Sequence, residues 1–127
     1  MKVAIRFSFL FLLTLLNSVT LQAQLAEFSF DKKIIKLPAA DAGEQLTMLF
    51  PFENTGTEPL IITKSEVECS CTRVTFPKEP ILPGEKAVIE VKFDSNGKMG
   101  WQYRKIILLA NIKKGREVIE FRVKIKN

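Results

Sequence analysis

The feature that most constrains this chain is an apolar residue at every second position, repeated in several segments after residue 24. The clearest case follows the Pro83-Gly84 turn, where four apolar residues share one phase: Ala87, Ile89, Val91 and Phe93. Successive side chains of a β-strand point to opposite faces, so these four residues share one face of a strand. An amphipathic helix would instead space its apolar residues three or four positions apart, and that spacing is hard to find after residue 24.

The same alternation predicts about eight short strands, with turn signals roughly every ten residues. The predicted segments are 25–30, 34–37, 45–53, 60–69, 72–76, 86–94, 101–110 and 117–126. This number and spacing are typical of an immunoglobulin-like sandwich. We therefore expect an all-β, immunoglobulin-like β-sandwich of seven to eight antiparallel strands, with a large share of the ten phenylalanines in its core.

Residues 1–23 have the pattern of a secretory signal peptide. Lys2 and Arg6 precede an apolar run over residues 7–16, and Ala23 supplies the small residue at the cleavage position. A run of about ten residues is too short to span a bilayer as a helix, which needs about 20. We therefore expect an exported protein, periplasmic or extracellular, without stable membrane insertion after cleavage. The mature chain, residues 24–127, is a single domain, and cleavage lowers the net charge from +5 to +3.

Several kinds of catalytic site are excluded by composition. The chain contains no histidine, which excludes Ser-His-Asp and Cys-His catalysis and histidine-ligated zinc. Glu66 and Glu68 could be paired carboxylates, but glutamates two apart on the outer side of a strand are usually solvated. No dense basic patch interleaves with aromatic residues along the sequence, so nucleic-acid binding has little support. We expect a non-enzymatic protein that requires no cofactor.

Cys69 and Cys71, separated by Ser70, are the only cysteines and the one place where chemistry could occur. In an extended strand their Cα atoms lie about 6.6 Å apart, so an internal disulfide requires a bend at Ser70. The open alternatives are two half-buried structural cysteines, either free or in a passive disulfide, thiol-redox exchange, a disulfide to a partner, or a soft-metal site for Cu(I) or Zn. A metal would need ligands from a second chain, because Met48 is expected in the core and Met99 is the only other thioether after residue 24.

Two surfaces are candidates for binding. Charged residues at every second position of segment 117–126 are typical of an edge strand, which could add a strand from a partner. Trp101 and Tyr103 are the best aromatic candidates for an exposed surface, although core packing at a strand start is the interpretation we favour. Pro51 lacks an N–H group, so segment 45–53 is expected to be an edge there, or to contain a bulge.

Four motifs carry a resemblance to a bacterial family of secreted proteins, domain-of-unknown-function family 1573. They are Phe50-x-Phe52-x-Asn54-Thr55-Gly56-x-x-Pro59-Leu60-x-Ile62, Cys69-Ser70-Cys71-Thr72, Pro80-Ile81-x-Pro83-Gly84-Glu85 with the strand that follows, and Gly100 with Lys105-Ile106-Ile107 and Ala110-Asn111. Ser70 departs from the family's glycine. The family resembles the major-sperm-protein and ciliary Hydin-like sandwiches, which are generally non-enzymatic interaction modules, and the resemblance implies no known activity.

Two functional hypotheses follow. The first is a secreted, non-enzymatic immunoglobulin-like domain that binds another envelope protein. The alternative is thiol-redox or soft-metal binding through Cys69 and Cys71.

Overall fold

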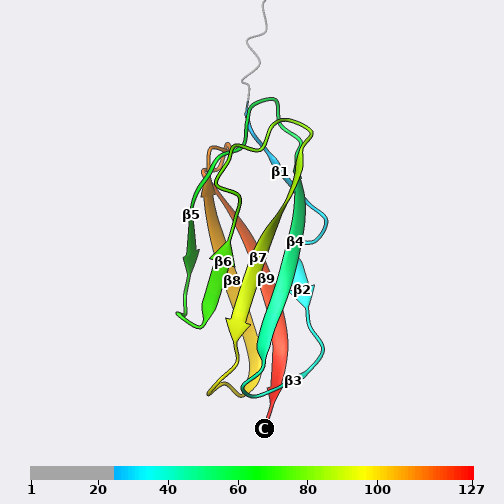
Figure 1. Ribbon diagram of the computed structural model, residues 1–127, viewed down its shortest axis with the longest axis vertical. Coiled ribbons are helices and arrows are strands. Elements are labelled where there is room, and N and C mark those ends of the chain that lie inside the picture. Colours follow the sequence, from blue (N-terminus) through cyan, green and yellow to red (C-terminus); the bar gives the residue numbers. More distant parts are fainter. Residues whose placement is uncertain (1–24) are drawn as a thin grey trace, which may run out of the picture.

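The structure, a computed structural model, describes residues 25–127 and contains only β-strands and connecting segments in that range. Nine strands form two sheets (Figure 1). They are β1 (Phe28–Phe30), β2 (Ile34–Lys36), β3 (Ala40–Asp41), β4 (Gln45–Asn54), β5 (Ile62–Val67), β6 (Thr72–Thr75), β7 (Lys86–Asp94), β8 (Gly100–Ala110) and β9 (Arg116–Lys126). The predicted all-β sandwich is confirmed. The predicted signal peptide lies outside the described residues. Within residues 25–127, no helix is long and apolar enough to cross a membrane.

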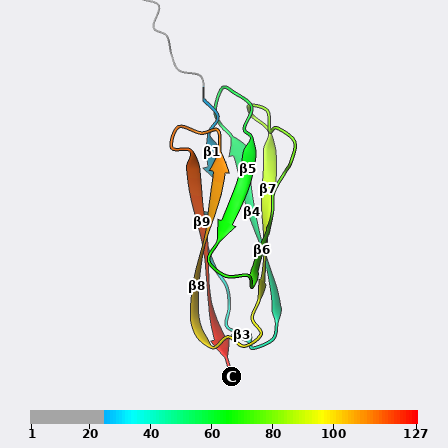
Figure 2. The same ribbon diagram turned by 90° about the vertical axis from the view of Figure 1, so that its left-hand side faces the viewer.

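The two sheets have different pairing patterns. One sheet has four antiparallel strands in the order β1-β4-β7-β6. The other has the order β2-β9-β8-β5, with β3 also paired to β9. Figure 2 shows β8 and β9 in one layer and β6 and β7 in the other.

The expectation of seven to eight strands, all antiparallel, is wrong in two respects. There are nine strands, and β2 and β3 both run parallel to β9. After β1 the chain crosses from the four-stranded sheet to the other sheet, and Pro38 separates the two short strands there. A crossing segment of this kind carries too few residues to show an alternation pattern in the sequence.

The prediction that segment 117–126 is an edge strand is also wrong. β9 pairs with β8 along one side and with β2 and β3 along the other. Its alternating charges have another cause. Ile119, Phe121, Val123 and Ile125 fill the core, so Arg122, Lys124 and Lys126 lie on the solvent-facing side of the sheet.

The core lies between the two sheets and is dominated by aromatic and branched aliphatic side chains. Six of the seven phenylalanines in the described range are buried, and Phe30 packs against them half-buried. Met48 is 2% exposed, as expected. Pro51 lies just past the end of β1, which pairs only with residues 52–54 of β4, so the predicted edge position is confirmed.

One end of the sandwich is closed around Asn54, which is fully buried. Its side-chain carbonyl accepts hydrogen bonds from the N–H groups of Glu27 and Gly56, at 3.2 and 3.0 Å. Its amide donates to the carbonyls of Glu58 and Ile81, at 2.8 and 2.9 Å. A single side chain thus joins the segment before β1, the turn after β4 and the loop of residues 77–84, which contains three prolines.

Candidate binding edge beside the disulfide loop

Cys69 and Cys71 form an internal disulfide, with their Cα atoms 5.1 Å apart. The backbone bends through a turn in which the N–H of Thr72 donates to the carbonyl of Cys69 at 3.1 Å. The N–H of Cys71 also donates to the sulfur of Cys69 at 3.2 Å. Within residues 25–127 only glycines have positive φ, so Ser70 makes this bend without the left-handed backbone that glycine would permit.

Residues 68–71, which we call the disulfide loop, connect the two sheets (Figure 2). β5 ends at Val67, opposite Ile106 of β8, and β6 begins at Thr72, opposite Phe93 in the other sheet. The chain therefore stops pairing with β8 where this loop begins. Residues 100–105 of β8 remain paired with β9 on one side, and no strand in the described part of the chain pairs with their other side. We call this segment, Gly100–Lys105, the open edge.

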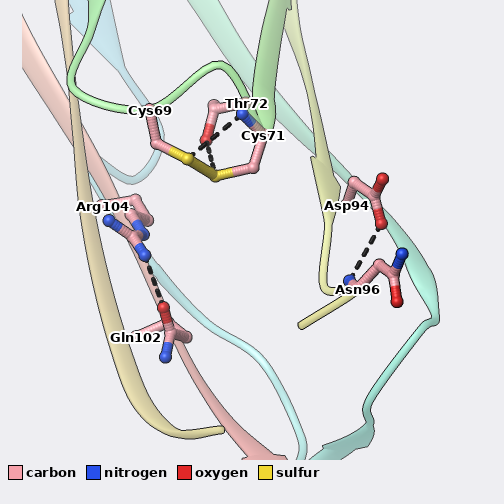
Figure 3. Close-up of a disulfide and its surroundings, with 7 residues drawn as sticks. All are labelled: Cys69, Cys71, Thr72, Asp94, Asn96, Gln102 and Arg104. Carbon is pink, nitrogen blue, oxygen red and sulfur yellow. Dashed lines mark hydrogen bonds between the residues drawn. A yellow bond between two sulfur atoms is a disulfide. The ribbon is translucent and has the colours of Figure 1, made fainter. Parts of the chain in front are cut away.

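On the inner side of the open edge, Gln102 and Arg104 occupy positions that farther along β8 are filled by Ile106 and Leu108. The guanidinium of Arg104 donates to the side-chain carbonyl of Gln102 at 2.6 Å. It also lies 5.9 Å from the centre of the Phe93 ring. Its Nε atom is buried and has no hydrogen-bond partner. Figure 3 shows both side chains below the disulfide loop.

On the outer side of the open edge, Trp101 and Tyr103 are 59% and 57% exposed. Their rings stack with centroids 6.1 Å apart. The expectation that they pack in the core is wrong. Ile106 and Leu108 are buried whereas Ile107 is half-buried, so Gln102 and Arg104 share the inner face of β8. The sequence leaves this phase open, because residues 106–109 are all apolar.

Basic residues lie beside this aromatic pair because β9 is the neighbouring strand. Arg122 is paired with Tyr103, and its guanidinium lies 5.7 Å from the ring centre; Lys124 is paired with Trp101. A hydrogen bond from Arg122 to Glu120 raises the pKa of the arginine above its ordinary value, so it stays charged. The sequence showed no such interleaving, since the aromatic and basic residues are some twenty positions apart and only the strand pairing brings them together.

The other candidate residues from the sequence do not form a catalytic or metal site within residues 25–127. Glu66 and Glu68 are exposed, and Glu66 pairs with Lys64 at 3.6 Å. No three of the metal-binding residue types His, Cys, Asp and Glu cluster within residues 25–127. Because the cysteines are bonded to each other, soft-metal binding stays a prediction for the reduced protein only.

Comparisons with known proteins agree with the sequence resemblance. The family model described as "Protein of unknown function (DUF1573)" matches residues 28–125. No curated protein sequence matches the chain.

Solved structures share the fold at low sequence identity. A protein of unknown function from Porphyromonas gingivalis W83 has a TM-score of 0.70 at 16% identity, over 85% of this chain and 51% of its own. The VesB protease of Vibrio cholerae has a TM-score of 0.60 at 17% identity, over 79% and 32%. The chaperone DraB of E. coli has a TM-score of 0.55 at 13% identity, over 80% and 56%. The chain thus spans about a third to somewhat more than half of these proteins.

Proposed function

Because this chain belongs to the DUF1573 family, we propose that it is an exported, non-enzymatic binding domain that holds an extended segment of another envelope protein. The segment would add to the open edge of β8 as a further antiparallel strand, in line with β5. The observation that carries this proposal is that β8 continues for residues 100–105 beyond the last partner residue of β5.

Strand addition supplies affinity through main-chain hydrogen bonds, and side-chain neighbours supply specificity. Residues 100–105 of β8 form one of the longer free edges in the described chain. The side of β4 beyond β1 is also unpaired over residues 45–51, but Pro51 within it cannot donate a hydrogen bond to an added strand. β1 and β2 have three residues each, β3 has two and β6 has four. β5 is comparable in length, but a register irregularity between Ile62 and Lys64 interrupts its pairing, and such irregularities discourage strand addition.

The fold occurs in proteins with different roles. DraB is described as a chaperone, which makes a binding role compatible with this fold. VesB is a protease, but the similarity covers only 32% of it. Identities of 13 and 17% carry the fold and not the activity of either protein. Catalysis by histidine is excluded by composition.

Site-specific photo-crosslinking in cells of the natural source tests this proposal. A photoreactive phenylalanine analogue replaces Tyr103 at the open edge or, as the matched control, Val88 on the outer face of the other sheet. Val88 is also exposed and also lies on a regular strand. We expect one crosslinked protein from position 103 and none from position 88. Equal crosslinking from both positions, or none from position 103, would contradict the proposal.

Thiol exchange at Cys69 and Cys71 is the second candidate, favoured by the half-buried disulfide that the loop forms. Alkylation followed by mass spectrometry, before and after treatment with a thiol-redox buffer, measures whether the bond exchanges. A bond that opens and closes at the potential of the compartment supports this function. A bond that stays closed under those conditions excludes it.

A further inference from the structure

Arg104 is an inward-facing cation at the open edge without an acidic partner. None of the ion pairs within residues 25–127 includes it. A guanidinium carries five N–H donors, and the side chain of Arg104 has one side-chain acceptor, that of Gln102. Its buried Nε–H is unsatisfied. Phe93 offers only the face of a ring to the charge.

The missing acceptor can reach Arg104 from one direction. On the β9 side, the residue directly opposite Arg104 is Phe121, which is fully buried and apolar. On the other side of β8 the position opposite Arg104 is unoccupied by any strand of the described chain. A residue at that position of an added strand would have its Cβ about 5 Å from that of Arg104 and would face the same side.

Covering the open edge also changes the energetics of Arg104. An added strand removes water from the guanidinium, and burying an unpaired charge is costly. A neutral segment would therefore bind at a penalty. A carboxylate opposite Arg104 would accept hydrogen bonds from the terminal N–H groups of the guanidinium and so offset the penalty.

The outer side adds a second requirement. In an antiparallel strand, the residue after the one opposite Arg104 lies opposite Tyr103. The residue two positions after the one opposite Tyr103 lies opposite Trp101. Aromatic and branched side chains pair favourably with aromatic residues across strands. Gln102 requires only a polar residue between them.

On the premise of the proposed function, we infer that the bound segment carries an acidic residue opposite Arg104, followed by an aromatic or branched residue, a polar residue and a second aromatic or branched residue. The partner is therefore an acidic, extended protein segment with a four-residue pattern. The inference concerns the specificity of the edge, beyond the existence of binding there.

Selection from a random 12-residue peptide library on the mature domain tests this inference. Amide hydrogen exchange first establishes which selected peptides protect residues 100–105. We expect those peptides to contain the acidic pattern, and replacement of the acidic residue by its amide to weaken binding about tenfold or more, as for a charged hydrogen-bonded pair. Arg104→Glu should abolish binding, and a peptide with lysine at the acidic position should restore it.

Lys86→Gln is the matched control, because Lys86 is an exposed lysine of β7, in the other sheet and away from the open edge. It should change affinity less than threefold. Edge-binding peptides without an acidic residue, bound equally by Arg104→Gln, would overturn the inference and leave the proposed function intact. If no peptide protects residues 100–105, both are overturned. Thermal unfolding of each variant verifies that it is folded.

Discussion

The two ends of this sandwich differ in whether their buried polar groups have hydrogen-bond partners. At one end Asn54 is fully buried, and four hydrogen bonds satisfy its side chain. At the other end Arg104 keeps an unpaired buried Nε–H beside an edge without a strand. Buried polar groups normally have partners. The Asn54 network stabilises the fold at its end, whereas the unpaired group at the other end agrees with our proposal that a partner strand adds there.

The largest effect is expected at Asn54. Asn54→Ala leaves two N–H groups and two carbonyls without their partner, so the free energy of unfolding should fall by about 3 kcal/mol or more. Urea unfolding monitored by tryptophan fluorescence measures this loss. Asn96→Ala, at an exposed turn, is the control and should change stability by less than about 0.5 kcal/mol. Similar values for both variants would show that the Asn54 network does not stabilise that end.

Gly56→Ala should have the next largest effect. A Cβ atom there would lie 2.7 Å from the Cα of Ala26 and closer still to the carbonyl oxygen of Leu25. Because this obstacle is backbone, the N-terminal segment must move, and we expect a loss of about 2 kcal/mol. Calorimetry measures the change, with the exposed neighbour Thr55→Ala as the control. A stability unchanged from wild type would mean that the segment before β1 packs differently.

Loss of the disulfide should have a smaller effect. Chain entropy gives about 1.6 kcal/mol for a loop of three residues, so the Cys69→Ser, Cys71→Ser double variant should lose at most about that amount. Amide exchange should accelerate in the loop and leave the Asn54 end unchanged. Faster exchange at the Asn54 end would contradict the separation of the two ends.

The smallest change in stability is expected for Arg104→Leu. This variant removes an unsatisfied inward-facing charge, so the free protein should keep its stability within about 1 kcal/mol or gain slightly. The crosslinked partner should nevertheless be lost. A marked loss of stability together with retained crosslinking would assign Arg104 to the fold and not to binding.

The sequence predicted the strands well because alternation is a local signal. The buried faces of β4, β7 and β9 follow directly from it. Strand pairing is not local. Nothing in segment 117–126 shows that β2 and β3 pair with its second side, so its outward charges alone resemble those of an edge strand.

The sequence indicates some residues of the candidate site but not how they come together. Cys69 and Cys71 stood out by composition, but whether they bond depends on the turn at Ser70. Arg104 was not singled out, because its importance depends on where β5 ends relative to β8. Its inward position also depends on which residues of the apolar run 106–109 face the core, and the sequence leaves that open.

Amide hydrogen exchange of residues 100–105, measured in the free domain and in the complex with the crosslinked partner, tests the central claim most directly. In the free domain, the amides of the open edge that point away from β9 should exchange much faster than those of residues 106–110, which have strands on both sides. In the complex they should become protected, while exchange around Asn54 stays the same. Protection that appears elsewhere, with residues 100–105 still exchanging fast, would contradict the account.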